Sequence, residues 1–208
     1  MASNETLDFI FERWSLDRNK KYIRMQGFSR EGTLARLFRR LNFKLGCEVG
    51  VERARFSKIL CQANPTLKLY GVDPWLFFED YRNHVNQERL DEFFRETRER
   101  MKPFNFQIIR DSSVNAARRF DDQILDFVYI DAMHDYKSVK EDIAAWHPKV
   151  KKGGIVSGHD YVDGRDNDRP DKPDYGVKKA VNQWVEEKHI KHLFILEKDH
   201  VPSWFYVK

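Results

Sequence analysis

The sequence predicts an α/β fold: a mixed, mostly parallel sheet of seven strands, with helices on both faces, an antiparallel last strand and a small N-terminal helical cap. Short apolar runs alternate with amphipathic stretches of helical length, which is typical of parallel strands joined by crossover helices. The final two apolar runs are separated only by a short turn that contains Pro202. One of these two strands must therefore run antiparallel, so the sheet is mixed at one edge.

Composition narrows the class of protein. The chain has 208 residues, of which 41% are hydrophobic and 34% charged, as expected of a globular domain with an N-terminal addition. Neither a secretory leader nor a membrane-spanning run is visible, so we expect a cytoplasmic protein without a membrane partner. Cys47 and Cys61 have no metal-ligand spacing and are expected to be inert core thiols. The formal net charge is only +4, although the region before residue 60 is basic and could attract an anionic substrate or nucleic acid.

The elements are expected in the following order. Apolar residues recur at helical spacing from Leu7 and again from Leu34, which predicts two helices within a cap over residues 1–43. The main domain, 44–208, is expected to hold strands at 44–50, 67–73, 106–111, 126–131, 154–160, 192–198 and 203–208. Amphipathic helices separate the first six strands. The polar segment 162–174, rich in Asp and Arg, is expected to be a lid, a binding loop or a mobile loop.

Ionisable residues stand where the predicted parallel strands end. In sheets of this kind, ligands bind at the carboxyl ends of the strands, so these residues are expected to open onto one face. They are Glu48 with Gly50, Asp73, Asp111 with Ser112, Asp131 with His134, and His159 with Asp160.

The first three strand ends resemble a nucleotide-type site, each with an ordinary alternative. Gly50 permits a tight strand-to-helix turn that a ligand can approach, but GxGxxG is absent because Ala54 stands where a further glycine would fall. Asp73 is placed to accept hydrogen bonds from a ribose, or is simply an exposed strand-end acid. Asp111 and Ser112 could reach an adenine, although capping the next helix is the simpler role for Ser112.

At this point the sequence resembles the class I S-adenosylmethionine-dependent methyltransferases, which have a Rossmann-like fold, and specifically the methyltransferase-24 type. The segments that carry the resemblance are "EVGVERARFS", "LYGVDPW", "IIRDSS", "DFVYIDAMHDY", "KEDIAAWHPKVKKGGIVSGHDY" and "YGVKKAVNQW", in this order. The resemblance covers about residues 44 to 208. It implies that Gly50 and the loop around it hold the methionine part of the cofactor S-adenosylmethionine, Asp73 its ribose, and Asp111 with Ser112 its adenine. Glu48 and Asp131 are also expected among the cofactor-binding residues.

A more distant similarity, to catechol-type O-methyltransferases, implies a divalent metal. Those enzymes hold the metal with an acid after the fourth strand and an acidic pair after the fifth, positions occupied here by Asp131 and by His159 with Asp160. Mg²⁺ prefers oxygen ligands, whereas a ligand set that includes imidazole suits Mn²⁺ or another transition metal. His134 stands where those enzymes carry a catalytic lysine. It is the first candidate for the general base, and His159 is the second.

The resemblance therefore implies an S-adenosylmethionine-dependent methyltransferase, acting on a hydroxyl of a small molecule or sugar. Metal dependence stays open, because the His159 and Asp160 side chains could instead hold each other and the acceptor. Two alternatives remain: an inactive cofactor-binding or nucleic-acid-binding module on the same fold, and a nicotinamide-dependent oxidoreductase, which would normally carry GxGxxG. Self-association into a homo-oligomer is also open. Trp75, Tyr136 and Tyr161 follow the same strand ends, as pocket walls or as core residues.

Overall fold

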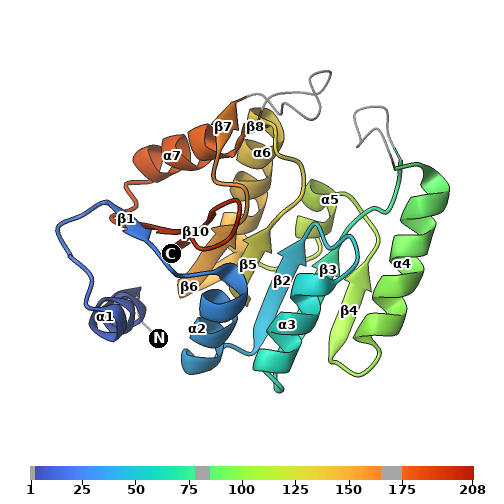
Figure 1. Ribbon diagram of the computed structural model, residues 1–208, viewed down its shortest axis with the longest axis horizontal. Helices are drawn as coiled ribbons and strands as arrows, with labels where there is room; N and C mark the ends of the chain where they lie inside the picture. Colours follow the sequence, from blue (N-terminus) through green and yellow to red (C-terminus); the bar gives the residue numbers. More distant parts are fainter. Residues whose placement is uncertain (1–2, 78–84, 165–174) are drawn as a thin grey trace.

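The computed structural model describes residues 3–77, 85–164 and 175–208, and Figure 1 shows a central twisted sheet between two layers of helices. The main sheet has eight strands in the order β1-β9-β10-β6-β5-β2-β3-β4. The strands are β1 Tyr22–Met25, β2 Leu45–Val49, β3 Lys68–Val72, β4 Phe106–Ile109, β5 Leu125–Ile130, β6 Val150–Gly158, β9 Leu193–Leu196 and β10 Ser203–Val207. Strands β7, Asp163–Gly164, and β8, Tyr175–Gly176, form a separate antiparallel pair.

The predicted mixed sheet is confirmed. The last strand, β10, pairs antiparallel with both β6 and β9, whereas the other described pairings of the main sheet are parallel. The sheet differs from the expectation in having an eighth strand, because β1 pairs parallel with β9 at the sheet edge. The segment 1–43 therefore contributes a strand as well as helices, and its separation as a cap at residue 43 stays a prediction.

The helices cover both faces of the sheet, as expected. They are α1 Ser3–Trp14, the π-helical turn η1 Arg30–Leu34, α2 Ala35–Arg40, α3 Arg55–Ala63, α4 Gln87–Met101, α5 Ser113–Ala117, α6 Tyr136–Trp146, the 3-10 turn η2 His147–Lys149 and α7 Val177–Glu187. Buried residues of α1 to α4 share one apolar cluster, and those of α5 to α7 share another. No helix in the described part of the chain is long and apolar enough to cross a membrane.

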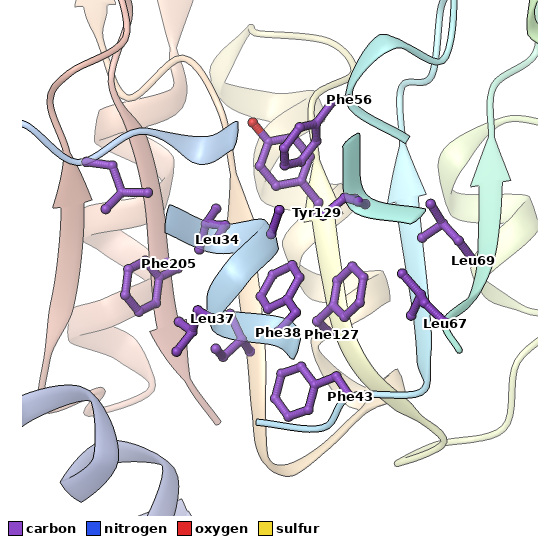
Figure 2. Close-up of a cluster of buried hydrophobic side chains, with 14 of the residues drawn as sticks. Leu34, Leu37, Phe38, Phe43, Phe56, Leu67, Leu69, Phe127, Tyr129 and Phe205 are labelled. Carbon is purple, nitrogen blue, oxygen red and sulfur yellow. The ribbon is translucent and has the colours of Figure 1, made fainter. Parts of the chain in front are cut away.

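The sheet separates these two cores, and successive residues of its central strands point to one core and then to the other, as the period of two in a β-strand requires. In β5, Phe127 and Tyr129 face the α1 to α4 side, and Val128 and Ile130 face the other. The first core is rich in phenylalanine (Figure 2): the rings of Phe38 and Phe127 stack with centroids 4.0 Å apart. Cys47 and Cys61 are both buried free thiols. This packing fixes the carboxyl ends of β2, β3, β5 and β6 beside one another.

Candidate active site

The turn that follows β2 lies directly against the end of β5. Gly50 has a φ of +86°, and a Cβ atom added to it would lie 1.9 Å from the backbone oxygen of Asp131. Only glycine fits there. Glu52 and Ala54 also have positive φ values, 50° and 52°. Ala54, which stands where a further glycine of GxGxxG would fall, thus adopts a left-handed conformation that glycine reaches more easily than alanine.

Asp73 holds this turn from the end of β3. One carboxylate oxygen accepts hydrogen bonds from the backbone amides of Val51 and Glu52, at 3.0 and 2.9 Å, and the other accepts one from Trp75 at 2.8 Å. Burial raises the pKa of Asp73, and these amides oppose that rise. Asp73 is 9% exposed, so in the described state its carboxylate shapes the turn through the backbone.

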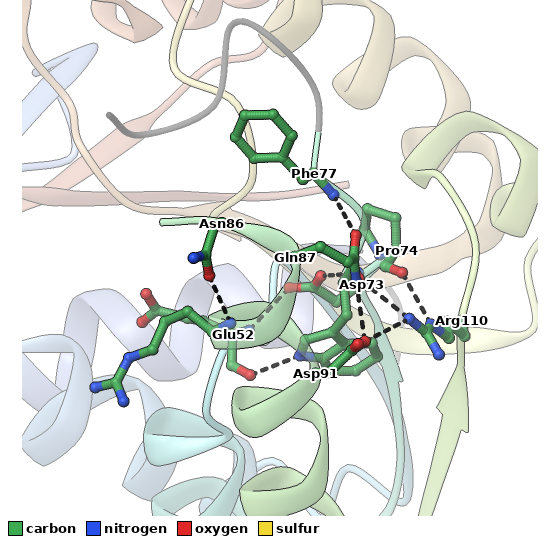
Figure 3. Close-up of polar contacts among 10 residues, drawn as sticks. Glu52, Asp73, Pro74, Phe77, Asn86, Gln87, Asp91 and Arg110 are labelled. Carbon is green, nitrogen blue, oxygen red and sulfur yellow. Dashed lines mark hydrogen bonds and ion pairs between the residues drawn. The ribbon is translucent and has the colours of Figure 1, made fainter. Parts of the chain in front are cut away.

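The segment after Asp73 is fixed by two side chains that sequence reasoning missed (Figure 3). Gln87 accepts a hydrogen bond from the Phe77 amide at 2.9 Å and donates one to the Trp75 carbonyl at 3.1 Å. Arg110, at the end of β4, donates to the carbonyls of Pro74 and Trp75, both at 3.2 Å. The hydrogen bonds of both side chains join residues that are 10 to 36 positions apart in the sequence, so no local pattern predicts them.

Asp111 and Ser112 lie beyond β4, at the N-terminus of α5. The Ser112 amide donates to the Asp111 carboxylate at 2.8 Å, and Arg119 forms an ion pair with the same side chain. Ser112 occupies the cap position of α5, but its side chain makes no capping hydrogen bond. The Ser112 hydroxyl is thus not used as the cap that its position suggested.

Three ionisable side chains converge where β5 and β6 end. His134 Nε2 lies 2.9 Å from Asp160 Oδ2 and 3.6 Å from Asp131 Oδ1. One ligand-type atom from each of Asp131, His134 and Asp160 lies within 4.8 Å of the others. His159 is adjacent rather than inside this group, with its Nδ1 atom 3.3 Å from Asp160 Oδ1. The structure thus gathers His134 with the two acids, whereas the expected metal set contained His159.

The imidazole of His134 is held between the two acids by charge. Burial disfavours its charged form, but the contacts with Asp131 and Asp160 outweigh burial and raise the pKa of His134 to about 9. Its Nε2 atom is nevertheless buried without a well-aligned hydrogen bond, so the 2.9 Å contact with Asp160 is an ion pair of poor hydrogen-bond geometry. The ring stacks on Tyr175, with centroids 5.3 Å apart.

Asp160 has a strained backbone at this point. Its φ is 52°, a conformation that costs a non-glycine residue about 1–3 kcal/mol and that concentrates at functional sites. The Asp160 side chain is 10% exposed. Burial favours its neutral form, yet the contacts with His134 and His159 dominate and keep the pKa of Asp160 well below its usual range. Asp160 is therefore a buried carboxylate whose charge two imidazoles stabilise.

Arg30, from η1 in the N-terminal segment, completes the cluster. Its guanidinium donates to Asp131 Oδ2 at 2.8 Å and to the Tyr129 hydroxyl at 3.1 Å. The Arg30 backbone amide is held in turn by Asp199, at 2.8 Å. Sequence reasoning missed Arg30 because it lies in a segment without a motif. Its partner Asp131 is 101 residues away along the chain.

Glu48 lies beneath this cluster and faces the same side of the sheet as Tyr129, its partner in the register of β2 with β5. It is 2% exposed and accepts a hydrogen bond from the Ser57 hydroxyl. Burial raises the pKa of Glu48 to about 8, and the nearby charge of Asp131 adds to that rise. Near neutral pH this carboxyl is therefore mostly protonated, and it adds little negative charge to the cluster.

The aromatic residues after the strands are packed into the protein. Trp75 is 1% exposed and Tyr161 is 6% exposed; the indole of Trp75 donates to the Glu52 carbonyl at 2.8 Å. Tyr136 contacts Gln183 of α7. For Trp75 and Tyr161, this favours core packing over a role as exposed pocket walls. The predicted loop at 162–174 falls mostly outside the described residues.

The comparisons with known proteins concern the family and the fold of the chain. A family model described as "Methyltransferase domain" matches residues 43–161. No curated protein matches the chain.

Solved structures with the same fold include several methyltransferases. One, from Staphylococcus aureus and described as a caffeoyl-CoA O-methyltransferase, has 15% identity and a TM-score of 0.62, covering 100% of this chain and 93% of its own. An O-methyltransferase from Bacillus cereus in complex with S-adenosylhomocysteine has 11% identity and a TM-score of 0.61, with 99% and 90% coverage. An O-methyltransferase family protein from Burkholderia thailandensis has 11% identity and a TM-score of 0.59, with 86% and 58% coverage. At these identities the likeness concerns the fold.

Proposed function

The chain belongs to the methyltransferase-domain family and is an enzyme of the class I S-adenosylmethionine-dependent type, and on that premise we propose that it methylates a hydroxyl of a small molecule or sugar. The observation that carries the proposal is the group Asp131, His134 and Asp160 at the strand ends, beside the Gly50 turn. Methyl transfer from a sulfonium to a hydroxyl oxygen needs an aligned acceptor and a group that takes the proton. The two acids and the imidazole can supply both.

The cofactor would lie along the ends of β2, β3 and β4. Gly50 and Glu52 in the turn after β2 are partly exposed, which leaves room for the methionine part beside the turn, and Asp131 lies directly against Gly50. Asp111 and Ser112 would face the adenine. Asp73 and Glu48 are 9% and 2% exposed; in this proposal Asp73 acts on the ribose side largely by holding the turn, and Glu48 supports the methionine side from below.

The donor set also fits a divalent cation. Asp131, His134 and Asp160 offer two carboxylates and one imidazole, and the buried Nε2 atom of His134 lacks a well-aligned hydrogen bond. Such a mixed set suits Mn²⁺ better than Mg²⁺. A bound cation would lower the pKa of the acceptor hydroxyl. His159 would then act by holding Asp160, its 3.3 Å neighbour.

In the alternative arrangement without a cation, in which His134 is not a ligand, His134 is the proposed general base, and its environment sets a condition. A pKa of about 9 means that His134 carries a proton near neutral pH in the ligand-free protein. It can accept the acceptor's proton only after losing its own. A positive charge bound next to Asp131 and Asp160 would weaken their stabilisation of the protonated imidazole. The pKa of His134 would then fall, and the ring would lose its proton more easily. Arg30 would keep Asp131 oriented until then, through its 2.8 Å contact.

Calorimetric titration with S-adenosylmethionine and S-adenosylhomocysteine tests the proposal, with NAD as the control ligand. Each titration is run in chelator and then with Mg²⁺ or Mn²⁺. We expect micromolar binding of both sulfur ligands and none of NAD. Asp131→Asn should weaken the binding, whereas Asp121→Asn, an exposed acid in the turn before β5, should not.

Turnover is then measured as S-adenosylhomocysteine formed with phenols, sugars and amines as acceptors. Formation with hydroxyl compounds supports O-methylation, and turnover with amines alone would contradict it. Cofactor binding without turnover for any acceptor would favour the inactive-module alternative. Binding of NAD in preference to the sulfur ligands would refute the proposal altogether.

A further inference from the structure

A hollow lies in the N-terminal part of the molecule, away from the group Asp131, His134 and Asp160, which we call the strand-end site. Its volume is about 360 Å³, within the range of small-molecule pockets. Its walls come from the end of α1, from the connection between β1 and η1, from η1 and α2, and from Lys198 in the β9–β10 turn. Figure 1 shows α1 and α2 on the same side of the sheet.

The rim of this hollow, which we call the basic pocket, is strongly cationic. Arg13, Arg36, Arg40 and Lys198 line it and are all exposed, and no acidic residue is among the described residues that line it. Within the described part of the chain, none of these four side chains has an ion-pair partner. Other basic residues nearby are paired: Arg18 with Asp8, and Arg24 with Glu197. An unpaired concentration of positive charge around one concavity favours an anionic ligand.

The floor of the basic pocket is apolar. Trp14 and Phe28 are half-buried and meet edge to face, with ring centroids 5.6 Å apart, and Leu37 is 1% exposed beside them. A bare inorganic anion would leave this aromatic surface uncovered. A ligand that carries both a flat or apolar group and an anionic group would match the floor and the rim together.

The basic pocket is separate from the strand-end site, although both use the η1 segment. Gly32 and Thr33 of η1 line the pocket, whereas Arg30 of the same turn reaches Asp131. None of the strand-end residues lines it. A ligand here would therefore leave the cofactor position free.

We propose that the basic pocket binds a phosphate-bearing small molecule, with the phosphate on Arg36, Arg40 and the other rim cations and its apolar part on Trp14 and Phe28. The guanidinium fork matches phosphate oxygens in a bidentate manner, which a lone ammonium does not. Arg36 and Arg40 lie one helical turn apart on α2, so they project on the same side and can hold one anionic group together. The small extent of the basic pocket, about 360 Å³, favours a small molecule over a nucleic acid, which needs an extended basic track.

The test is calorimetric titration of the full chain, saturated with S-adenosylhomocysteine if it binds, with 1-naphthyl phosphate, with its uncharged analogue 1-naphthol, and with pyrophosphate. We expect 1-naphthyl phosphate to bind at least tenfold more tightly than either of the others. The double variant Arg36→Gln/Arg40→Gln should weaken it at least tenfold, and Lys198→Gln less. Arg39→Gln is the matched control, because Arg39 lies on the same helix but donates to the Ala63 carbonyl, at 3.3 Å.

Several outcomes would overturn the proposal. They are no binding of 1-naphthyl phosphate at millimolar concentration, an equal loss in Arg39→Gln, or displacement of the probe by S-adenosylhomocysteine. Tighter binding of a single-stranded oligonucleotide that depends on Arg39 as much as on Arg36 would point to an extended basic surface instead. Circular dichroism of each variant separates loss of binding from loss of fold. Because the readout is binding at a separate site, it does not depend on whether the methyltransferase proposal succeeds.

Discussion

Replacing Gly50 with alanine tests whether the β2 turn and the end of β5 are held in contact by the absence of a side chain. At a φ of +86° the new Cβ would lie 1.9 Å from the Asp131 carbonyl oxygen and 2.4 Å from its carbonyl carbon. Backbone atoms cannot rotate away as the end of a side chain can. One of the two strand ends must therefore move.

Two costs add in this variant. The left-handed conformation costs an alanine about 1–2 kcal/mol, and forcing extra volume into a packed site costs about 1–3 kcal/mol more. The free energy of unfolding should therefore fall by about 2–5 kcal/mol. Gly27→Ala is the matched control: its φ is +78°, and nothing lies within 4 Å of the added Cβ. It should show only the conformational cost of about 1–2 kcal/mol.

Urea unfolding of the wild type and both variants measures the difference, provided that the dependence on denaturant stays the same. Titration with S-adenosylhomocysteine adds a second readout: Gly50→Ala should weaken binding at least tenfold, because Asp131 moves with the clash, and Gly27→Ala should not. Equal destabilisation by the two substitutions would refute the reasoning, since the contact with Asp131 would then contribute nothing.

Three further predictions concern the same face of the sheet and the core beneath it. His134→Ala should lower turnover at least a hundredfold with little change in S-adenosylhomocysteine affinity, whereas Asp73→Ala should weaken that affinity at least tenfold by releasing the turn; equal loss of affinity in both would contradict this division of roles. Arg30→Gln should tighten Mn²⁺ binding at least tenfold in titration calorimetry, because it frees Asp131 Oδ2 and removes a positive charge. The control Arg24→Gln should leave Mn²⁺ binding unchanged. Weaker Mn²⁺ binding in Arg30→Gln would mean that Arg30 is needed to orient Asp131. Burial raises the pKa of Asp142 from 3.8 to about 7. Between these two pH values the folded state keeps a proton that the unfolded state releases, so the free energy of unfolding falls as the pH rises from 3.8 to about 7. Asp142→Asn should therefore gain about 2–4 kcal/mol over the wild type at pH 8 and less at pH 5, and a gain that is the same at both pH values in urea unfolding would exclude this cause.

The sheet core and its strand-end acids could be predicted because each depends on local pattern. Apolar runs that end in Asp73, Asp111 and Asp131 mark the ends of three parallel strands, and the topology then brings such ends together. The same reasoning placed His134 and Asp160 on one face, and the structure brings them within 2.9 Å. Which imidazole joins the two acids depends on side-chain direction, which spacing along the chain does not define.

The N-terminal contribution could not be predicted from local pattern. Strand β1 has only four residues with alternating burial, too short a signal to separate from a loop, and its partner β9 lies near the other end of the chain. Arg30 directly follows a turn without a motif, and its importance comes only from the contact with Asp131. The basic pocket likewise joins Arg13 and Lys198 from opposite ends of the sequence.

The pairing of β1 with β9 has a consequence for the order of folding during synthesis. Tyr22 finds its strand partner in Leu193, and the Lys198 amide bonds to the Phe28 carbonyl. The first strand of the chain must therefore wait, unpaired, until almost the whole protein has left the ribosome, and contacts of such long sequence separation form late. Arg30 belongs to the same N-terminal segment, so we expect its contact with Asp131 to form late, after the acids and the histidine have been brought together.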